Sequence, residues 1–312
     1  MARHRLLASA TGLALLFSLS LTLGLNVHTT NAALPHIRPA IPAVIGDQTT
    51  RSAAGDFGSP IFNQIEQRGV LRVGTLSDYP PIAAVDPKTG KQVGFENDLA
   101  RDMAAAMGVK IQFVDVPFST LIAGLQAGKF DIIAAQMAIK AQRALAIDFT
   151  KPWEAVGDSL VVLKSSGVTT SNAVSILNNS SHSISLILGG VEEQTRAQIF
   201  PKAKVVAVTG ESDEFLNLLS RRVNAVITDN VSAAVFAKNH PEVTVLFDGS
   251  KVPFLANFPS ATGVPKGNLE FVHWVDDWMA KEVDSGRYAQ LWHQDVGGQA
   301  AISQLQLERG QF

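Results

Sequence analysis

The chain has 312 residues, of which 46% are hydrophobic and 17% are charged, so it predicts one or two folded units and excludes a disordered protein. It contains no cysteine, which excludes disulfides, Cys-ligated metals, a thiol nucleophile and a lipid anchor on an N-terminal cysteine. With 26 Lys and Arg against 28 Asp and Glu, it offers no basic excess to a nucleic acid or an anionic membrane.

Residues 1–32 predict a secretory signal peptide. Two arginines near the start precede an apolar run from Leu6 to Leu25, and small and polar residues follow up to Ala32. These features are typical of a signal that is cleaved near Ala32. The alternative is a membrane anchor, since the run approaches the roughly 20 residues that span a bilayer. Residues 33–58 contain three prolines and no periodic pattern, and predict a flexible leader.

From residue 59 onward, strand-like and helix-like segments alternate. Phe95, Leu99, Met103 and Met107 have helical spacing, and Gly108 follows them at the position that ends many helices. The order β-α-β-α-β indicates a mostly parallel sheet covered by helices. The segments are a strand at 70–75, a helix at 95–107, a strand at 109–116, a helix at 120–127 and a strand at 130–135.

A second unit repeats this alternation after a β-rich stretch at 159–166. The last helical pattern, at 269–283, carries an apolar stripe that must pack on a core already built. Two such α/β lobes with a cleft between them make a natural ligand site. The segments of the second unit are a strand at 183–188, a helix at 191–200, a strand at 204–208, a helix at 211–220 and a strand at 223–228.

Five segments also carry recognisable motifs in a fixed order. They are GVLRVGTLSDYPP (69–81), GFENDL (94–99), LIAGLQAGKFD (121–131), MAIKAQRALAIDFTKPW (137–153) and AVITD (225–229). Together they resemble the periplasmic solute-binding proteins of polar amino-acid ABC transporters, the family 3 extracellular solute-binding proteins. The resemblance covers roughly residues 60–298.

The resemblance implies an α/β fold of type II, with two lobes joined by two extended hinge crossovers. We expect lobe 1 to comprise residues 59–158 and 256–298, lobe 2 to comprise 159–255, and residues 299–312 to form a C-terminal tail. It further implies a periplasmic monomer that captures an amino acid or a related small carboxylated metabolite. Hinge closure on the ligand would then present the protein to a membrane ABC permease.

The resemblance assigns the ligand's head group to Arg143 and Asp229. A guanidinium is a rigid fork that matches a carboxylate, and Arg143 would hold the ligand's α-carboxylate. Asp229 follows a strand, at the sheet edge where ligands of α/β proteins bind, and would hold the α-ammonium. The alternatives are a surface Arg143 paired with an acid such as Asp148, and an Asp229 that caps the following helix.

Three further candidates follow from the aromatic loop and its neighbours. The resemblance places Tyr79 and Phe118 as walls around the ligand side chain. Phe118 could instead fold onto the helix that follows it as a hydrophobic staple. Asp78 lies beside this wall and is expected either to contact a cationic ligand or to cap a turn.

Several positions depart from the family pattern around the ligand's carboxylate. The turn at Gly190 and Val191 replaces Gly-Thr-Thr by Gly-Gly-Val, so backbone donors to an anion remain but hydroxyls do not. Ala138 and Lys140 stand where Ser or Thr is usual, and Gln136 is the expected substitute donor. These departures predict a ligand other than a small aliphatic amino acid. If Lys140 faces the cleft, a ligand with extra negative charge is expected.

The main alternative function is enzymatic, because cyclohexadienyl dehydratases share this fold. Their acid, a glutamate three positions after the strand-end Asp, is matched by Ser232, which cannot donate a proton as a carboxylic acid does. Their active-site Trp is matched by Phe118. The chain has no HExxH, GxSxG or P-loop motif, so we expect no metal, no cofactor and no catalysis. A sensor domain is a third class, but no kinase or further membrane span follows.

Overall fold

The computed structural model describes residues 59–297. The predicted signal peptide (1–32), the leader (33–58) and the tail (299–312) lie outside these residues and stay predictions. Within the described part of the chain, none of the helices has the length and apolar character needed to cross a membrane.

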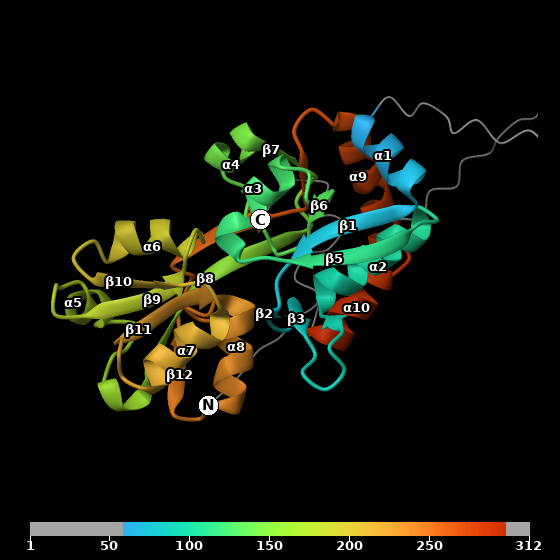
Figure 1. The fold of residues 1–312 in the computed structure, drawn as a ribbon. Helices are drawn as coiled ribbons and strands as arrows, with labels where there is room; N and C mark the ends of the chain where they lie inside the picture. Colours follow the sequence, from blue (N-terminus) through green and yellow to red (C-terminus); the bar gives the residue numbers. More distant parts are fainter. Residues whose placement is uncertain (1–58, 298–312) are drawn as a thin grey trace, which may run out of the picture. The chain divides into compact units, whose positions relative to one another are not determined.

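The first sheet has the strand order β5-β1-β6-β14-β7 (Figure 1). β1 (Val70–Thr75) pairs in parallel with β5 (Lys110–Asp115) and with β6 (Ile132–Ile133). β14 (Gly263–Pro265) pairs antiparallel with β6 and with β7 (Ile147–Phe149). The predicted parallel strands are therefore present, although the strand expected at 130–135 is only two residues long as β6.

Helices bury their apolar faces against this sheet. In α2 (Phe95–Ala106) the spacing seen in the sequence is confirmed, since Phe95, Leu99 and Met103 are fully buried. Burying each such side chain contributes roughly 1.5–3 kcal/mol. The helix ends before Gly108, whose positive φ of 68° suits glycine. The other helices around this sheet are α1 (Pro60–Arg68), α3 (Leu121–Gln126), α4 (Ala141–Ala146), α9 (Leu269–Asp284) and α10 (Arg287–Asp295).

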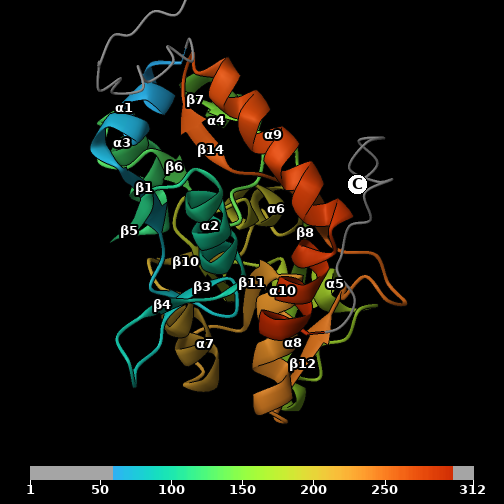
Figure 2. The ribbon, with the colours of Figure 1, turned by 90° about the vertical axis from the view of Figure 1, so that its right-hand side faces the viewer.

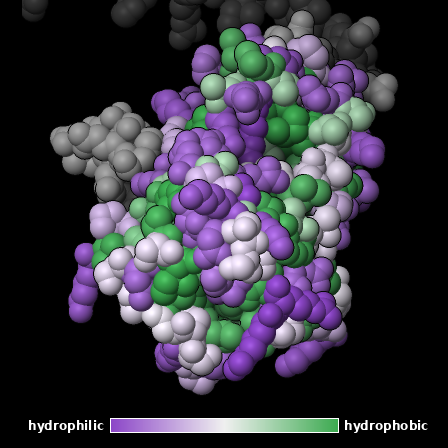
Figure 3. Space-filling model, turned by 90° about the vertical axis from the view of Figure 1, so that its left-hand side faces the viewer, coloured by the Kyte–Doolittle hydropathy of each residue, from purple (hydrophilic) through white to green (hydrophobic). Residues whose placement is uncertain are grey.

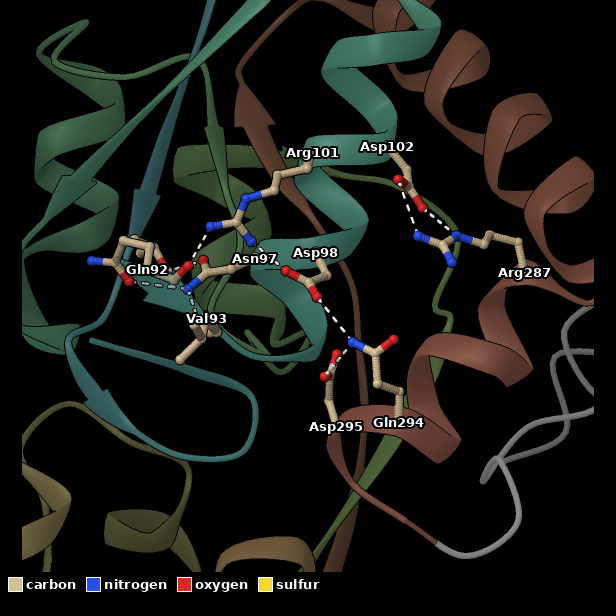
Figure 4. A network of polar contacts seen from close by, with 10 residues as sticks. Gln92, Val93, Asn97, Asp98, Arg101, Asp102, Arg287, Gln294 and Asp295 are labelled. Atoms are coloured by element: carbon tan, nitrogen blue, oxygen red, sulfur yellow. Dashed lines mark hydrogen bonds and ion pairs between the residues drawn. The ribbon is translucent and has the colours of Figure 1, made fainter. Parts of the chain in front are cut away.

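Helix α10 packs on α2, and both apolar and polar contacts join them (Figures 2 and 4). The ring of Phe95 meets the rings of Tyr288 and Trp292 edge-on, at centroid distances of 5.2 and 5.0 Å. At the surface, Arg287 Nε donates to Asp102 Oδ2 over 2.6 Å. Because exposed ion pairs contribute at most about 1 kcal/mol, the buried rings dominate this interface.

The second sheet has the order β10-β9-β11-β8-β12, with β13 also paired to β8. β9 is parallel to β10 and to β11, as the alternating pattern predicts, and the pairs made by β8 are antiparallel. The strands are β8 (Glu154–Leu163), β9 (Ser183–Ile187), β10 (Lys204–Val208), β11 (Ala225–Asp229), β12 (Val243–Leu246) and β13 (Ala256–Ser260).

β8 and β13 carry the chain between the two sheets. The chain leaves β7 of the first sheet, enters the second through β8, and returns through β13 to β14. The two segments pair antiparallel from Asp158 opposite Ala256 to Glu154 opposite Ser260. This arrangement agrees with the expected pair of extended crossovers, and it explains why both sheets are mixed rather than purely parallel.

Within residues 59–297, the helices that accompany the second sheet are α5 (Ala173–Leu177), α6 (Glu192–Ile199), α7 (Glu211–Leu219) and α8 (Asn230–Asn239). On the face in Figure 3, hydrophilic and hydrophobic residues are interspersed. Among the described residues, the exposed large apolar side chains, such as Leu145 and Leu216, belong to different elements. Scattered exposed apolar residues are ordinary in folded proteins, so they carry no functional argument.

A small third sheet was not predicted from the sequence. Its strands β2 (Asp78–Tyr79), β3 (Ala83–Val85) and β4 (Gln92–Val93) have only two or three residues each, too few for a periodic pattern. It fixes the position of the aromatic loop, because Asp78 and Tyr79 pair with Ala84 and Ala83.

Candidate ligand-binding site

A cavity of about 310 Å³ is lined by residues that belong to both large sheets and to the small one. This volume is near the lower end of the range of small-molecule sites, which suits a single metabolite. The nine residues that were predicted to contact a ligand line it, namely Asp78, Tyr79, Phe118, Gln136, Ala138, Arg143, Gly190, Val191 and Asp229. That they bind a ligand stays a prediction.

Arg143 lies on α4, and it is part of the cavity lining. Its two terminal nitrogens donate to Ala138 O over 2.8 Å and to Gly189 O over 2.9 Å, and its guanidinium lies 5.3 Å from the centre of the Phe118 ring. Arginine has five N–H donors, so others are available to a ligand. The alternative that Arg143 pairs with Asp148 at the surface is wrong, because Asp148 pairs with Lys266 over 2.7 Å and Arg143 is buried.

Asp229 is the N-cap of α8, as the alternative reading of the sequence expected. Its Oδ1 accepts hydrogen bonds from Val231 N (2.8 Å) and Ser232 N (2.9 Å). Its Oδ2 lies 3.0 Å from the Tyr79 hydroxyl, and the residue lines the cavity. A carboxylate has several acceptor positions, so capping leaves room for a contact with a ligand ammonium.

Gln136 connects the cavity to two buried acids that the sequence reasoning missed. Its Nε2 donates to Glu154 Oε2 over 2.6 Å, its backbone N–H donates to Glu96 Oε2 over 2.8 Å, and its Oε1 contacts the Tyr79 hydroxyl. Burial raises the pKa of Glu96 to about 7 and raises that of Glu154 well above its ordinary value. The expected donor role of Gln136 would therefore depend on its second amide hydrogen.

The turn before α6 differs from the expectation for an anion site. Gly189 N donates to Glu193 Oε1 over 2.9 Å, and Gly190 N donates to Ile187 O over 3.1 Å. These two backbone donors are thus used within the chain, and the carboxylate of Glu192 lies directly against Gly190. Although Gly190 lines the cavity, the expectation that its N–H receives a ligand carboxylate is wrong in this arrangement.

Asp78 bridges the small sheet to the second sheet's helix α7. Its carboxylate accepts hydrogen bonds from Ser212 N over 3.0 Å and from Ser212 Oγ over 2.7 Å. A negative charge at the start of a helix is favourable, because it meets the free N–H groups there. The carboxylate of Asp78 thus meets the start of a helix 134 residues away in sequence, rather than capping a turn as the alternative expected.

Acidic side chains dominate the charge of the lining. The carboxylates are those of Asp78, Asp115, Glu192, Glu211, Asp213 and Asp229, and the one arginine of the described lining is Arg143. Lys140 is the residue before α4 and is not part of the lining. The expectation of a ligand with extra negative charge, which depended on Lys140 facing the cleft, is therefore opposed by the structure.

Comparison with known proteins agrees with this architecture. The family model for bacterial extracellular solute-binding proteins, family 3, matches residues 71–294. A probable amino-acid ABC transporter-binding protein of Haemophilus influenzae is 28% identical over 214 residues, which are 66% of this chain and 77% of that protein.

Two solved structures resemble the chain with higher identity. One is an ancestral amino acid-binding protein described as a precursor of cyclohexadienyl dehydratase, with 32% identity, a TM-score of 0.69, and coverage of 75% of this chain and 99% of that one. The other is an ancestral arginine-binding protein bound to arginine, with 32% identity, a TM-score of 0.66, and coverage of 74% and 99%. The family match spans well over half of the sequence, and the chain belongs to the bacterial extracellular solute-binding proteins, family 3.

Proposed function

We propose that the protein is the periplasmic binding component of an ABC importer and that it captures a free amino acid in the cavity. The observation that carries this proposal is that a buried guanidinium, that of Arg143, and a buried carboxylate, that of Asp229, line the same cavity. An α-carboxylate and an α-ammonium are the complementary groups for such a pair. The names of the family and of the relatives support this role.

Capture by hinge closure is the mechanism we infer. Several contacts join elements of lobe 1 (59–158 and 256–298) to elements of lobe 2 (159–255). Those around the cavity include Tyr79 with Asp229, Arg143 with Gly189 O, and Asp78 with Ser212. A ligand that bridges the same elements would add to these contacts and favour the closed arrangement, which a permease then recognises. The protein acts as a monomer in this proposal.

The periplasmic location rests on the sequence of the first 32 residues. Cleavage near Ala32 would release the protein from the membrane after export. Expression of the full-length gene in a Gram-negative host, followed by mass determination of the periplasmic protein, tests this. A retained N-terminus in the membrane fraction would support the anchor alternative instead.

Direct binding measurements test the proposed function. The purified protein is unfolded and refolded to remove any ligand, and is then titrated calorimetrically with the common amino acids and with small carboxylates that lack an amine. We expect saturable binding of at least one amino acid and much weaker binding of its deaminated analogue. Equal binding of the analogue would remove Asp229 from the head-group role.

A dehydratase is the second candidate, because one similar structure is described as a precursor of such an enzyme. Ser232, which stands at the position of the enzymes' acid, is buried and does not line the cavity. We therefore expect no turnover of prephenate or arogenate. Turnover above background by purified protein would favour the enzyme and would direct attention to Glu211, an acid in the lining.

A further inference from the structure

Two acids in the lining are not needed for an amino-acid head group. Glu192 begins α6 and Glu211 begins α7. Glu211 is 5% exposed, and its Oε1 has no hydrogen-bond partner among residues 59–297. Glu192 Oε2 is likewise shielded and without a partner in that range. A buried carboxyl oxygen without a partner is costly, so such groups in a cavity indicate a missing partner.

Helix capping does not account for these two acids, because other acids already meet the helix starts. Glu193 accepts from Gly189 N at the turn before α6, and Asp78 accepts from Ser212 N at the start of α7. The positive end of each helix thus has its own carboxylate. Glu192 also meets its own backbone N–H, and Glu211 meets the Ser232 hydroxyl. The oxygens without a partner, Glu192 Oε2 and Glu211 Oε1, are therefore available for another positive group.

No basic side chain of the described lining neutralises them. The charges of Arg143 and Lys140 both interact with Glu192. Among the described residues, however, neither side chain is a hydrogen-bonding partner of the unpartnered oxygens, Glu192 Oε2 and Glu211 Oε1. A positive group of the ligand can supply that partner.

We propose that Glu192 and Glu211 form a cation subsite, so that the ligand is an amino acid with a positively charged side chain, an ammonium or a guanidinium. This inference rests on the proposed function, because Arg143 and Asp229 are taken to hold the head group. It names the part of the cavity that selects among amino acids.

The subsite also makes binding depend on pH. Burial, together with Asp158 and Asp229, raises the pKa of Glu192 to about 8, whereas Arg143 lowers it. Burial, followed by the charges of Asp229, Asp78 and Glu192, raises the pKa of Glu211 well above its ordinary value, against a lowering by Ser232. Glu192 therefore holds a proton near neutral pH in the free protein, and Glu211 gives up its proton less readily than an exposed glutamate does.

A cationic ligand stabilises the ionised form of each acid, so its binding must expel protons. We expect the affinity for such a ligand to rise between pH 6 and pH 8. Calorimetry in two buffers with different ionisation enthalpies should show net proton release. A neutral amino acid should release fewer protons.

The test compares arginine and lysine with citrulline, whose neutral side chain has nearly the shape of arginine's. Calorimetric titrations at pH 8 use the wild type, Glu211→Gln, Glu192→Gln and the control Glu214→Gln. Glu214 is buried on the same helix as Glu211 and has both carboxyl oxygens unpartnered in the described chain, but it does not line the cavity.

We expect the wild type to bind arginine or lysine at least about tenfold more tightly than citrulline. Glu211→Gln and Glu192→Gln should each reduce this preference severalfold, and Glu214→Gln should preserve it. Thermal melts establish that each variant is folded. If Glu211→Gln does not fold, Glu192→Gln decides, because its residue is less buried.

Equal binding of citrulline and arginine by the wild type would overturn the subsite while leaving the proposed function intact. So would an unchanged preference in Glu192→Gln and Glu211→Gln. If no amino acid binds, a titration with agmatine, which has the guanidinium but no carboxylate, tests the cation subsite separately from the proposed amino-acid function. Agmatine binding that is lost in Glu211→Gln would retain the subsite without the amino-acid function, and no agmatine binding would overturn both.

Discussion

Two groups of buried acids lie near the cavity, and their surroundings differ. Behind Gln136, Glu96 and Glu154 each have one carboxyl oxygen bonded to that glutamine, and neither lines the cavity. At the starts of α6 and α7, Glu192 and Glu211 line the cavity with oxygens that have no partner in the described chain. Glu96 Oε1 and Glu154 Oε1 also have no partner in the described chain, so an unpartnered oxygen does not separate the two groups. The difference is position, because of these four acids only Glu192 and Glu211 line the cavity.

Substitution of Arg143, the proposed head-group arginine, should cause the largest loss of ligand affinity. We expect Arg143→Ala to weaken binding by about 2–5 kcal/mol, or roughly thirty- to several-thousandfold, because it removes one partner of a buried charge pair. Arg143→Lys should also bind poorly, since a single ammonium cannot replace the fork. Calorimetry measures the affinities.

Arg287→Ala is the matched control for this prediction. Arg287 of α10 pairs with Asp102 of α2 (Figure 4) and is not part of the lining. The Arg287→Ala variant should bind the ligand with the same affinity as the wild type. Wild-type binding by Arg143→Ala would contradict the head-group assignment.

The acids behind Gln136 should govern stability rather than ligand choice. Because the pKa of Glu96 is raised from 4.5 to about 7 on folding, the folded protein retains a proton that the unfolded chain loses. The free energy of unfolding should therefore fall as pH rises from about 4.5 to 7, by on the order of 1–3 kcal/mol. Glu96→Gln cannot ionise and should lose much of this decline.

Urea denaturation between pH 5 and pH 8 measures that decline. Glu66→Gln, which changes an exposed acid on α1, should follow the wild-type profile. A Glu96→Gln profile as steep as that of the wild type would show that Glu96 ionises freely in the folded state.

Elements with a long or continuous sequence pattern could be predicted, whereas very short strands could not. The helix at 95–107 and the strand at 204–208 were predicted nearly to the residue, because their patterns are long or continuous. β2, β7 and β14 were missed, since strands of two or three residues exist only through their tertiary pairing.

Site residues follow a similar rule. Arg143 and Asp229 could be found because motifs mark them. Glu192 and Glu211 could not, because an acid in the first turn of a helix is expected there in any case. Only the cavity, which the fold creates, distinguishes them from ordinary acids that stabilise a helix start.

The chain has two tyrosines, one in the cavity lining and one outside it, and they allow a second comparison with a smaller expected effect. Tyr79 lies in the lining, and its hydroxyl is 3.0 Å from Asp229 Oδ2. Tyr288 is not part of the lining, and its hydroxyl donates a hydrogen bond of 3.0 Å to Trp153 O. We expect Tyr79→Phe to weaken ligand binding roughly two- to tenfold, the effect of one hydrogen bond. Tyr288→Phe should lower the melting temperature and leave the affinity unchanged. The reverse pattern would place the important hydroxyl outside the site.

Lys140→Ala should have the smallest effect on ligand affinity. The size of this effect tests whether the Lys140 charge contributes to ligand binding. It lies next to α4, and burial followed by repulsion from Arg143 lowers its pKa. Because it is outside the lining, Lys140→Ala removes no ligand contact, and removing its charge changes only the field at Arg143 and at nearby acids such as Glu192. We expect the affinities for arginine and for glutamate to change by about twofold or less. A large loss of glutamate binding with unchanged arginine binding would instead restore Lys140 as an anion-binding residue, and would require it to turn into the cavity when the ligand enters.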